Sequence, residues 1–365
     1  MKKYSIFMAV AALMFAVSCN KEEVNVDTTA PVETELITVD LNPMTKTALG
    51  VEGTTTWDAD DKVSVTVGGE VVGTLSLVEG STFSGEITAG LSGAAVLNYP
   101  AGVTTVPTTQ TAVAGSFADA AALLEGTTTV EDLRAGTGVE LKNKTALLMF
   151  TVAQAGDVTF EVGTAKYTVT GCKTGETYYA GVTPASDVTF VARIGGYLSK
   201  QAPKNVSFSA SKIANLETLP APEKCSWGMV GQHQGWDITK PTEMYKVYEG
   251  EGDNNVNDVY ALLNIKLLDN GFKFAKFNLK NWNTSNTYFG AWTKSSGKDY
   301  YNFTKDCGLQ KWYDMWTDSC SSQSENIGVD DWNKHYDVYI KMTEYYPNSQ
   351  HMFYTIVEAG TEIKF

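Results

Sequence analysis

Short runs in which apolar and polar residues alternate recur along the chain from Ile37 onward, and glycine-rich breaks separate them. Early examples are ITVDL, KVSVTV at 62–67 and VVGTLSLV at 71–78. A period of two residues places every second side chain on the same face of an extended strand. Short strands bounded by glycine-rich turns are typical of antiparallel sheets. The pattern therefore predicts an all-β chain.

The runs fall into three groups, which predicts several domains. A second group spans residues 141–219, and a stiff linker, PAPEK at 220–224, leads to a third. A chain of 365 residues also exceeds the usual size of one hydrophobic core. One helix is expected after Ser116, which would cap FADAAALLE. We predict a multidomain fold of successive antiparallel β-sandwiches, Ig-like or transthyretin-like, at residues 36–115, 116–220 and 225–365.

The first twenty residues have the layout of a secretory signal. Lys2 and Lys3 give a basic start, and an apolar run at 6–17 leads through small residues to Cys19. At about twelve residues, this run is too short to span a bilayer. It resembles the lipobox of bacterial lipoproteins, which implies a signal peptide at 1–18, a diacylated Cys19 and a flexible tether at 19–35. An ordinary secretory signal with a chance cysteine is the alternative.

The sequence NKEE after Cys19 resembles the signal that sends lipoproteins of Bacteroides-like bacteria to the outer face of the outer membrane. We therefore expect a lipid-anchored protein that faces the cell exterior. Composition argues against a nucleic-acid partner, because 28 Lys and Arg stand against 42 Asp and Glu and only two arginines occur, Arg134 and Arg193. Phosphate binding requires clustered positive charge.

Several weak motifs follow one another in a characteristic order between residues 35 and 220. They include TKTAL at 45–49, WDADDKVSV at 57–65, Tyr99-Pro100, KNKTALLMF at 142–150 and SASKIANLETL at 209–219. Together they resemble the fimbrillin-like lipoproteins of Bacteroides, which implies two β-sandwich lobes and a core position for Trp57. Pilus-forming members are cleaved after an arginine near the N-terminus. Because this chain has no arginine before Arg134, its lobes are expected to lift another module off the membrane.

Aromatic residues crowd the last 141 residues, which hold seven of eight tryptophans and twelve of eighteen tyrosines. The order WGMVG at 227–231, Gly235-Trp236, GFKF at 271–274, Trp282 and YFG at 288–290 resembles the starch-binding domains of SusE/SusF lipoproteins. This resemblance implies a carbohydrate-binding β-sandwich at 225–365. An insert at 293–323, which contains Trp312 and Trp316, does not match the pattern.

The rings of this module divide by their surroundings. Trp227, Phe272 and Phe274 alternate along apolar strands and are predicted to lie in the core. Four rings occur in polar segments and are predicted to stack on sugar, with local packing as the alternative for each: Trp236, Trp282, Tyr288 and Trp292. Lys273 and Lys276 are predicted to bind sugar hydroxyls. The resemblance points to the same positions.

Other chemistry has weak signals. Cys307 and Cys320 enclose a short loop and are disulfide candidates in an oxidising compartment. Residues 253–258 carry calcium-like oxygen donors but lack the EF-hand Gly and terminal Glu, so a polar turn is predicted. The three histidines have no metal or triad spacing, and no catalytic carboxylate pair is evident. We expect no metal, no cofactor and no enzymatic activity.

The expected function is capture of an oligosaccharide or polysaccharide, with a glucan as one option, for an outer-membrane uptake system that includes a TonB-dependent transporter. The alternative is a fimbrillin-like adhesin or pilus accessory protein, in which the lobes carry the function. An enzyme ranks third. The sequence does not identify the glycan, because specificity depends on ring angles and hydroxyl contacts.

Overall fold

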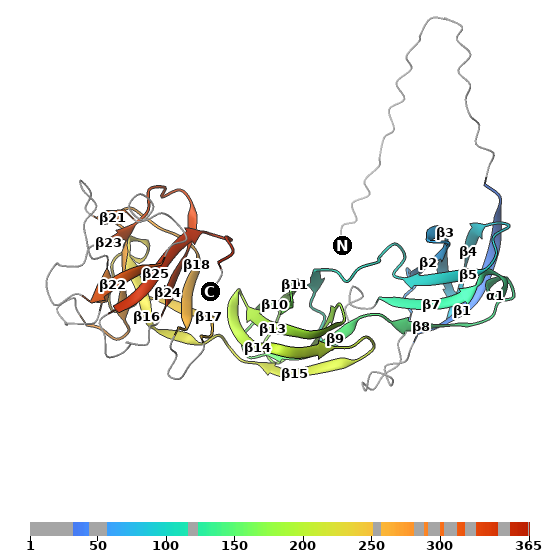
Figure 1. The fold of residues 1–365 in the computed structure, drawn as a ribbon, viewed down its shortest axis with the longest axis horizontal. Coiled ribbons are helices and arrows are strands. Elements are labelled where there is room, and N and C mark those ends of the chain that lie inside the picture. The colour runs from blue at the N-terminus through green and yellow to red at the C-terminus, as the bar shows by residue number, and fades with distance from the viewer. Residues whose placement is uncertain are drawn as a thin grey trace, which may run out of the picture.

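The computed structural model describes residues 32–43, 57–115, 123–250, 257–280, 288–290, 300–302, 312–317, 326–341, 351–363 and 365. Nearly all regular elements in these ranges are β-strands, which confirms the predicted all-β class. Three units lie in a row, with the middle one between the other two (Figure 1). No described helix has the length and apolar character needed to cross a membrane.

The first unit, the N-terminal barrel, is a closed barrel rather than the predicted sandwich. Strand β1 closes it, because Thr34 to Asp40 pair antiparallel with β4 while Leu41 to Pro43 pair parallel with β8. Its strands, in spatial order, are β1 (Thr34–Pro43), β4 (Thr82–Thr88), β3 (Glu70–Glu79), β2 (Lys62–Val67), β5 (Ala94–Tyr99), β7 (Leu124–Thr129) and β8 (Val139–Asn143).

Alternation fills the interior of the barrel with apolar side chains. Val63, Val65, Leu75 and Phe83 are fully buried in it. Trp57 packs against this core as predicted: its ring centroid lies 4.9 Å from that of Phe83, and its Nε1 donates to the Leu41 carbonyl at 3.3 Å. Where β3 and β4 approach, a Cβ on Gly73 would lie 2.3 Å from the Glu86 carbonyl oxygen, so glycine is required there.

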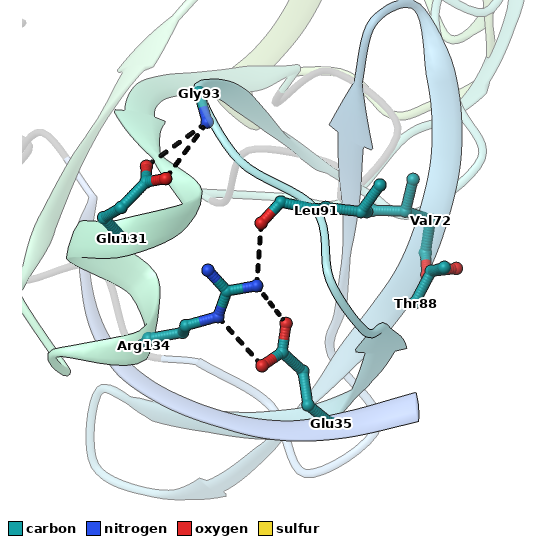
Figure 2. Close-up of polar contacts among 7 residues, drawn as sticks. All are labelled: Glu35, Val72, Thr88, Leu91, Gly93, Glu131 and Arg134. Atoms are coloured by element: carbon teal, nitrogen blue, oxygen red, sulfur yellow. Dashed lines mark hydrogen bonds and ion pairs between the residues drawn. The ribbon is translucent and has the colours of Figure 1, made fainter. Parts of the chain in front are cut away.

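A short helix, α1 (Val130–Arg134), is bonded to β1, the first strand of the barrel, through Arg134 (Figure 2). Thr129 caps it by accepting a hydrogen bond from the Asp132 amide at 3.1 Å. Arg134 binds the Glu35 carboxylate of β1 with two hydrogen bonds, from Nε at 2.8 Å and from Nη2 at 2.6 Å, one to each carboxylate oxygen. Its Nη2 also donates to the Leu91 carbonyl at 2.7 Å. The hydrogen bonds from Arg134 lower the pKa of Glu35.

The predicted helix after Ser116 is contradicted at its end, because Leu124 and Glu125 belong to β7. Residues 116–122 lie outside the described ranges. The observed helix begins at Val130, five residues after Glu125, the last residue of the predicted helix. Thr129 caps the observed helix, as Ser116 was expected to cap the predicted one, and Glu131 and Asp132 make its first turn acidic.

The middle sandwich packs two sheets over one core, as predicted for the second lobe. The larger sheet has the order β14 (Tyr197–Phe208), β13 (Ala185–Ile194), β10 (Gly156–Val162), β11 (Ala165–Cys172) and β6 (Thr109–Thr111). The smaller has the order β12 (Tyr178–Val182), β9 (Ala146–Val152) and β15 (Ile213–Leu219). Phe150 and Phe160 meet edge to face between them, with ring centroids 5.0 Å apart.

The boundary between the first two units does not fall at the predicted position, 115/116. Strand β6 pairs with β11 of the middle sandwich, in parallel register from Thr109 opposite Thr168. The chain then returns to the barrel for β7 and β8 before it enters the sandwich again at β9. Three chain segments therefore connect these two units, so a cut at 115/116 would divide both sheets.

The C-terminal module, residues 224–365, contains the remaining strands. Pairing runs from β16 through β17, β18, β24, β25, β22, β20 and β19 back to β16, so the strands form a closed circuit. Its strands are β16 (Lys224–Gly231), β17 (Thr242–Tyr248), β18 (Val259–Lys266), β19 (Phe272–Lys276), β20 (Tyr288–Gly290), β21 (Tyr300–Asn302), β22 (Tyr313–Thr317), β23 (Asn326–Gly328), β24 (His335–Lys341) and β25 (His351–Glu358).

A specific joint connects the middle sandwich to the C-terminal module. Arg193 of β13 bonds to both units, because its Nε donates to Glu161 at 3.0 Å and its Nη1 donates to the Val247 carbonyl at 2.7 Å. The Tyr197 hydroxyl accepts a hydrogen bond from the Leu263 amide at 3.3 Å. A Cβ on Gly196, whose φ is +87°, would lie 2.9 Å from Leu263, so the turn between β13 and β14 fits closely against β18.

Replacing Arg193 with Ala should loosen this joint, because it removes the hydrogen bond to Val247 and leaves the Glu161 carboxylate without its guanidinium. A hydrogen bond to a charged group contributes about 1.5–3 kcal/mol. Hydrogen–deuterium exchange should become faster in β17 and β18. Arg134→Ala is the matched control and should accelerate exchange in β1 alone. Unchanged exchange in β18 of Arg193→Ala would contradict the role given to this arginine.

Candidate binding surface

The aromatic rings of the C-terminal module have different environments. Trp227 is 1% exposed, and Phe272 and Phe274 are fully buried, which confirms their predicted core positions. Trp312 also packs partly buried, against an apolar cluster on the side of the module that meets Tyr197 of the middle sandwich. Core packing therefore accounts for several of the rings that crowd this part of the sequence.

Trp236 differs from these rings because it lies half-buried on the outside of the module. It follows a single turn of 3-10 helix, η3 (Gln232–Gln234), and has a φ of +60°, next to Gly235 at +74°. Its ring packs against the small cluster of Val230, Ile238 and Ala275. Its Nε1 donates to Gln232 at 3.1 Å. One face of the indole is thus supported by the protein.

The loop around Trp236 is held by hydrogen bonds of its own. The Asp237 amide donates to the Gln234 side chain at 2.7 Å, and Thr239 donates to Asp237 through its hydroxyl at 2.5 Å and its amide at 3.0 Å. The hydrogen bonds from Thr239 lower the pKa of Asp237. A ring fixed in this way loses little conformational entropy when a ligand binds.

The two predicted lysines lie on opposite faces of β19. Lys273 alternates with the buried Phe272 and Phe274 and shares its face with Ala275, on the same side as Trp236. Lys276 is paired with Trp227, and its Nζ lies 5.2 Å from the centre of that ring. The structure therefore brings Trp236 and Lys273 to one face and places Lys276 on the other.

The remaining predicted site residues are not placed by the described part of the chain. Tyr288 is described through its backbone, which pairs with Ala275 in the sheet. Trp282, Trp292, the lipidation candidate Cys19 and the disulfide candidates Cys307 and Cys320 lie outside the described residues. Their roles stay predictions.

His233 supports the same loop in its neutral form. Its Nε2 lies 2.9 Å from the Thr242 hydroxyl, and burial lowers its pKa to about 4.

The two described cysteines, Cys172 and Cys225, are buried free thiols whose pKa is raised to about 12 by burial, so neither supplies a thiolate nucleophile at neutral pH. Among the described residues no group of three or more His, Cys, Asp or Glu side chains is placed to hold a metal ion.

A buried ion pair includes Asp258, the last residue of the predicted polar turn at 253–258, of which residues 257 and 258 belong to the described part. The Nζ of Lys246 is 2.8 Å from the Asp258 carboxylate and 2.6 Å from that of Glu223, and only 7% of the lysine side chain is exposed. Burial alone would lower the pKa of Lys246, but hydrogen bonds to Asp258 and Glu223 outweigh it and raise the pKa. The Tyr260 hydroxyl donates to Glu223 at 2.9 Å, so this network also fixes the end of the linker.

Comparison with solved structures finds Bacteroides proteins of low identity. A candidate cell adhesion protein from Bacteroides ovatus is 12% identical, with a TM-score of 0.35, over 51% of this chain and 92% of that one. A fimbrial protein from the same species is 12% identical, with a TM-score of 0.29, over 62% of this chain and 57% of its own. A candidate cell adhesion protein from Bacteroides uniformis has a TM-score of 0.28 at 12% identity, over 50% of this chain and 93% of that one. No protein-family model and no curated protein matches the chain.

Removal of one partner from the buried ion pair should destabilise the C-terminal module strongly. Asp258→Ala leaves the buried Lys246 ammonium with only the half-exposed Glu223 as its partner. Removal of a buried partner typically costs about 3–5 kcal/mol in the free energy of unfolding, and Glu223 should keep the loss near the lower end. The double change Lys246→Met with Asp258→Leu should recover much of that loss. Urea unfolding measures both. The exposed pair Lys334–Glu358 is the control, since Lys334→Met should leave the stability nearly unchanged. Equal effects at the two pairs would contradict this account.

The pH dependence of stability should report the neutral His233. Its ordinary pKa of 6.5 falls to about 4 in the folded state, so between these values the unfolded chain binds a proton that the folded chain does not. The free energy of unfolding should therefore fall as the pH is lowered from 6.5 to 4. His233→Gln should reduce that fall, measured by urea unfolding at several pH values. Parallel curves for wild type and variant would show that His233 contributes nothing.

Proposed function

We propose that this protein is a non-catalytic adhesion protein of the cell surface, in which the C-terminal module is the binding tip. The observation that carries the proposal is the arrangement of the three units. Strand β1 lies in the unit farthest from the C-terminal module, and the joint at Arg193 fixes that module to the middle sandwich (Figure 1). An anchor preceding β1, diacylated at Cys19 in the outer membrane, would hold the tip away from the lipid.

The connections between the units suit this display. Three chain segments link the barrel to the sandwich, and the joint at Arg193 combines charged, aromatic and backbone contacts. A support of this kind limits the orientations of the tip, so its binding surface faces outward more consistently than on a flexible linker.

A second candidate function is glycan capture for an outer-membrane uptake system that includes a TonB-dependent transporter. The surface formed by Trp236 and Lys273 favours it. Trp236 packs partly buried on Val230, Ile238 and Ala275. An indole suits the C–H face of a sugar ring, and ammonium groups donate hydrogen bonds to hydroxyls. The two candidates share this surface and differ in what happens to the bound glycan, which an adhesin retains and an uptake system transfers.

Substitutions in β19 and its neighbouring loop test the binding tip. Trp236→Ala and Lys273→Ala in the full chain should each weaken retention on a glycan array at least tenfold, or about 1.4 kcal/mol. Lys276→Ala is the matched control on the opposite face of the strand and should bind like the wild type. Circular dichroism should show that all three fold. Wild-type retention by Trp236→Ala and Lys273→Ala would refute this surface as the tip's binding site.

A further inference from the structure

A cleft of about 640 Å³ lies between the middle sandwich and the C-terminal module. The turns β10–β11 and β13–β14 form one wall, and strands β17, β18 and β24 form the other. The last described residues, 360–363 and 365, also line it, and the C-terminus lies between these two units (Figure 1). Small-molecule sites of about 300–1,000 Å³ occur preferentially at such boundaries between domains.

The charged side chains that line this cleft have partners within the protein. Two cations and three carboxylates line it, namely Lys166, Arg193, Glu161, Asp337 and Glu362. Arg193 bonds to Glu161, and Lys166 lies 3.1 Å from Glu362. Asp337 accepts backbone amide hydrogen bonds from Asn264 at 2.7 Å and Gly360 at 3.1 Å. An ionic ligand would have to compete with these partners.

A neutral ligand rich in hydroxyl groups would not meet that competition. A guanidinium has five N–H donors, of which the contacts to Glu161 and Val247 use two, and a carboxylate offers about four acceptor positions. Hydroxyl groups can therefore add hydrogen bonds to Arg193 and Glu161 without breaking the joint. Both a donor and an acceptor are available on the same wall.

An aromatic ring supplies the apolar part of the cleft. Phe365 is 42% exposed, and it is the only aromatic residue among the exposed large apolar side chains of the described part. Its ring centroid lies 5.4 Å from that of Tyr248 and 5.7 Å from that of Tyr339, so neighbouring rings support it. A supported, partly exposed ring beside hydroxyl-binding groups matches the two surfaces of a sugar.

We propose that this cleft is a second binding site, which takes a short uncharged oligosaccharide stacked on Phe365 and hydrogen-bonded to Arg193 and Glu161. It is separate from the Trp236 surface, because Trp236 packs on Val230, Ile238 and Ala275, and none of these residues lines the cleft. Ligand bound there touches both units and stiffens the joint.

The test uses the full chain and isothermal titration calorimetry with maltohexaose, cellohexaose, mannohexaose and xylohexaose as neutral probes. Hexagalacturonate is the anionic probe. At least one neutral probe should bind, and Phe365→Ala should weaken it at least tenfold. Leu268→Ala, an exposed apolar side chain outside the cleft, is the matched control and should leave affinity unchanged. Trp236→Ala should retain the cleft-bound probe.

Saturation-transfer NMR provides the second readout, since the aromatic protons of Phe365 should transfer magnetisation to the bound probe in the wild type and in Trp236→Ala. The proposal is overturned if no neutral probe binds, if hexagalacturonate alone binds, or if Phe365→Ala binds like the wild type. Loss of all binding in Trp236→Ala would also overturn it, because the Trp236 surface would then account for recognition.

Discussion

The position of the C-terminal module depends on one guanidinium group. Arg193 is 20% exposed at its side chain, bonds to Glu161 within the middle sandwich and reaches the Val247 carbonyl in the neighbouring module. Arginine suits this place because its planar group donates in two directions at once and stays charged at any physiological pH. Lysine has a single ammonium and could not span the two units with the same geometry. Tyr197 packs against Tyr245 at the same joint, and Arg193 lines the cleft between the two units.

The barrel and the middle sandwich are combined in a different way, through the path of the chain. Strand β6 leaves the barrel for the edge of the sandwich, and β7 and β8 return to it. Parallel pairing of β1 with β8 then closes the barrel and leaves no free edge between those strands. Arg134 secures the same strand β1 through Glu35. Both arginines of the chain therefore hold elements that are distant in sequence.

Local patterns predicted the local features of this structure. Alternation identified the strand segments and assigned Trp227, Phe272 and Phe274 to the core, because the face on which a strand residue lies depends on its position in the strand. Barrel closure was not predictable in this way, since it depends on the pairing of Leu41 in β1 with the distant Val139 in β8. The return of β7 was not predictable either, since it depends on pairing with β5 across the intervening strand β6. Strand β6 has three residues, too few for a periodic signal. The domain boundary was misplaced for this reason.

The buried ion pair shows a signal that sequence reasoning missed. Lys246 occupies the same alternating position as the buried Met244 in β17, and a lysine directed into a core requires an acidic partner. Asp258, the residue immediately before β18, satisfies that requirement. For the candidate site, Trp236, Lys273 and Lys276 were predicted together, and their binding roles stay predictions. The separate faces of Lys273 and Lys276 follow from the register of β19 against β16.

The charge of the molecule favours uncharged ligands at both surfaces discussed above. The formal net charge of the chain is −14, so an anionic ligand meets general repulsion. Its described arginines are engaged in structural contacts, and Lys246 and Lys166 are paired with carboxylates. What these surfaces offer instead is supported aromatic rings beside paired polar groups. A polymer that contacts both the Trp236 surface on the tip and the cleft between the tip and the middle sandwich would form its second contact at a high effective concentration. Weak single sites are sufficient for firm attachment under that condition.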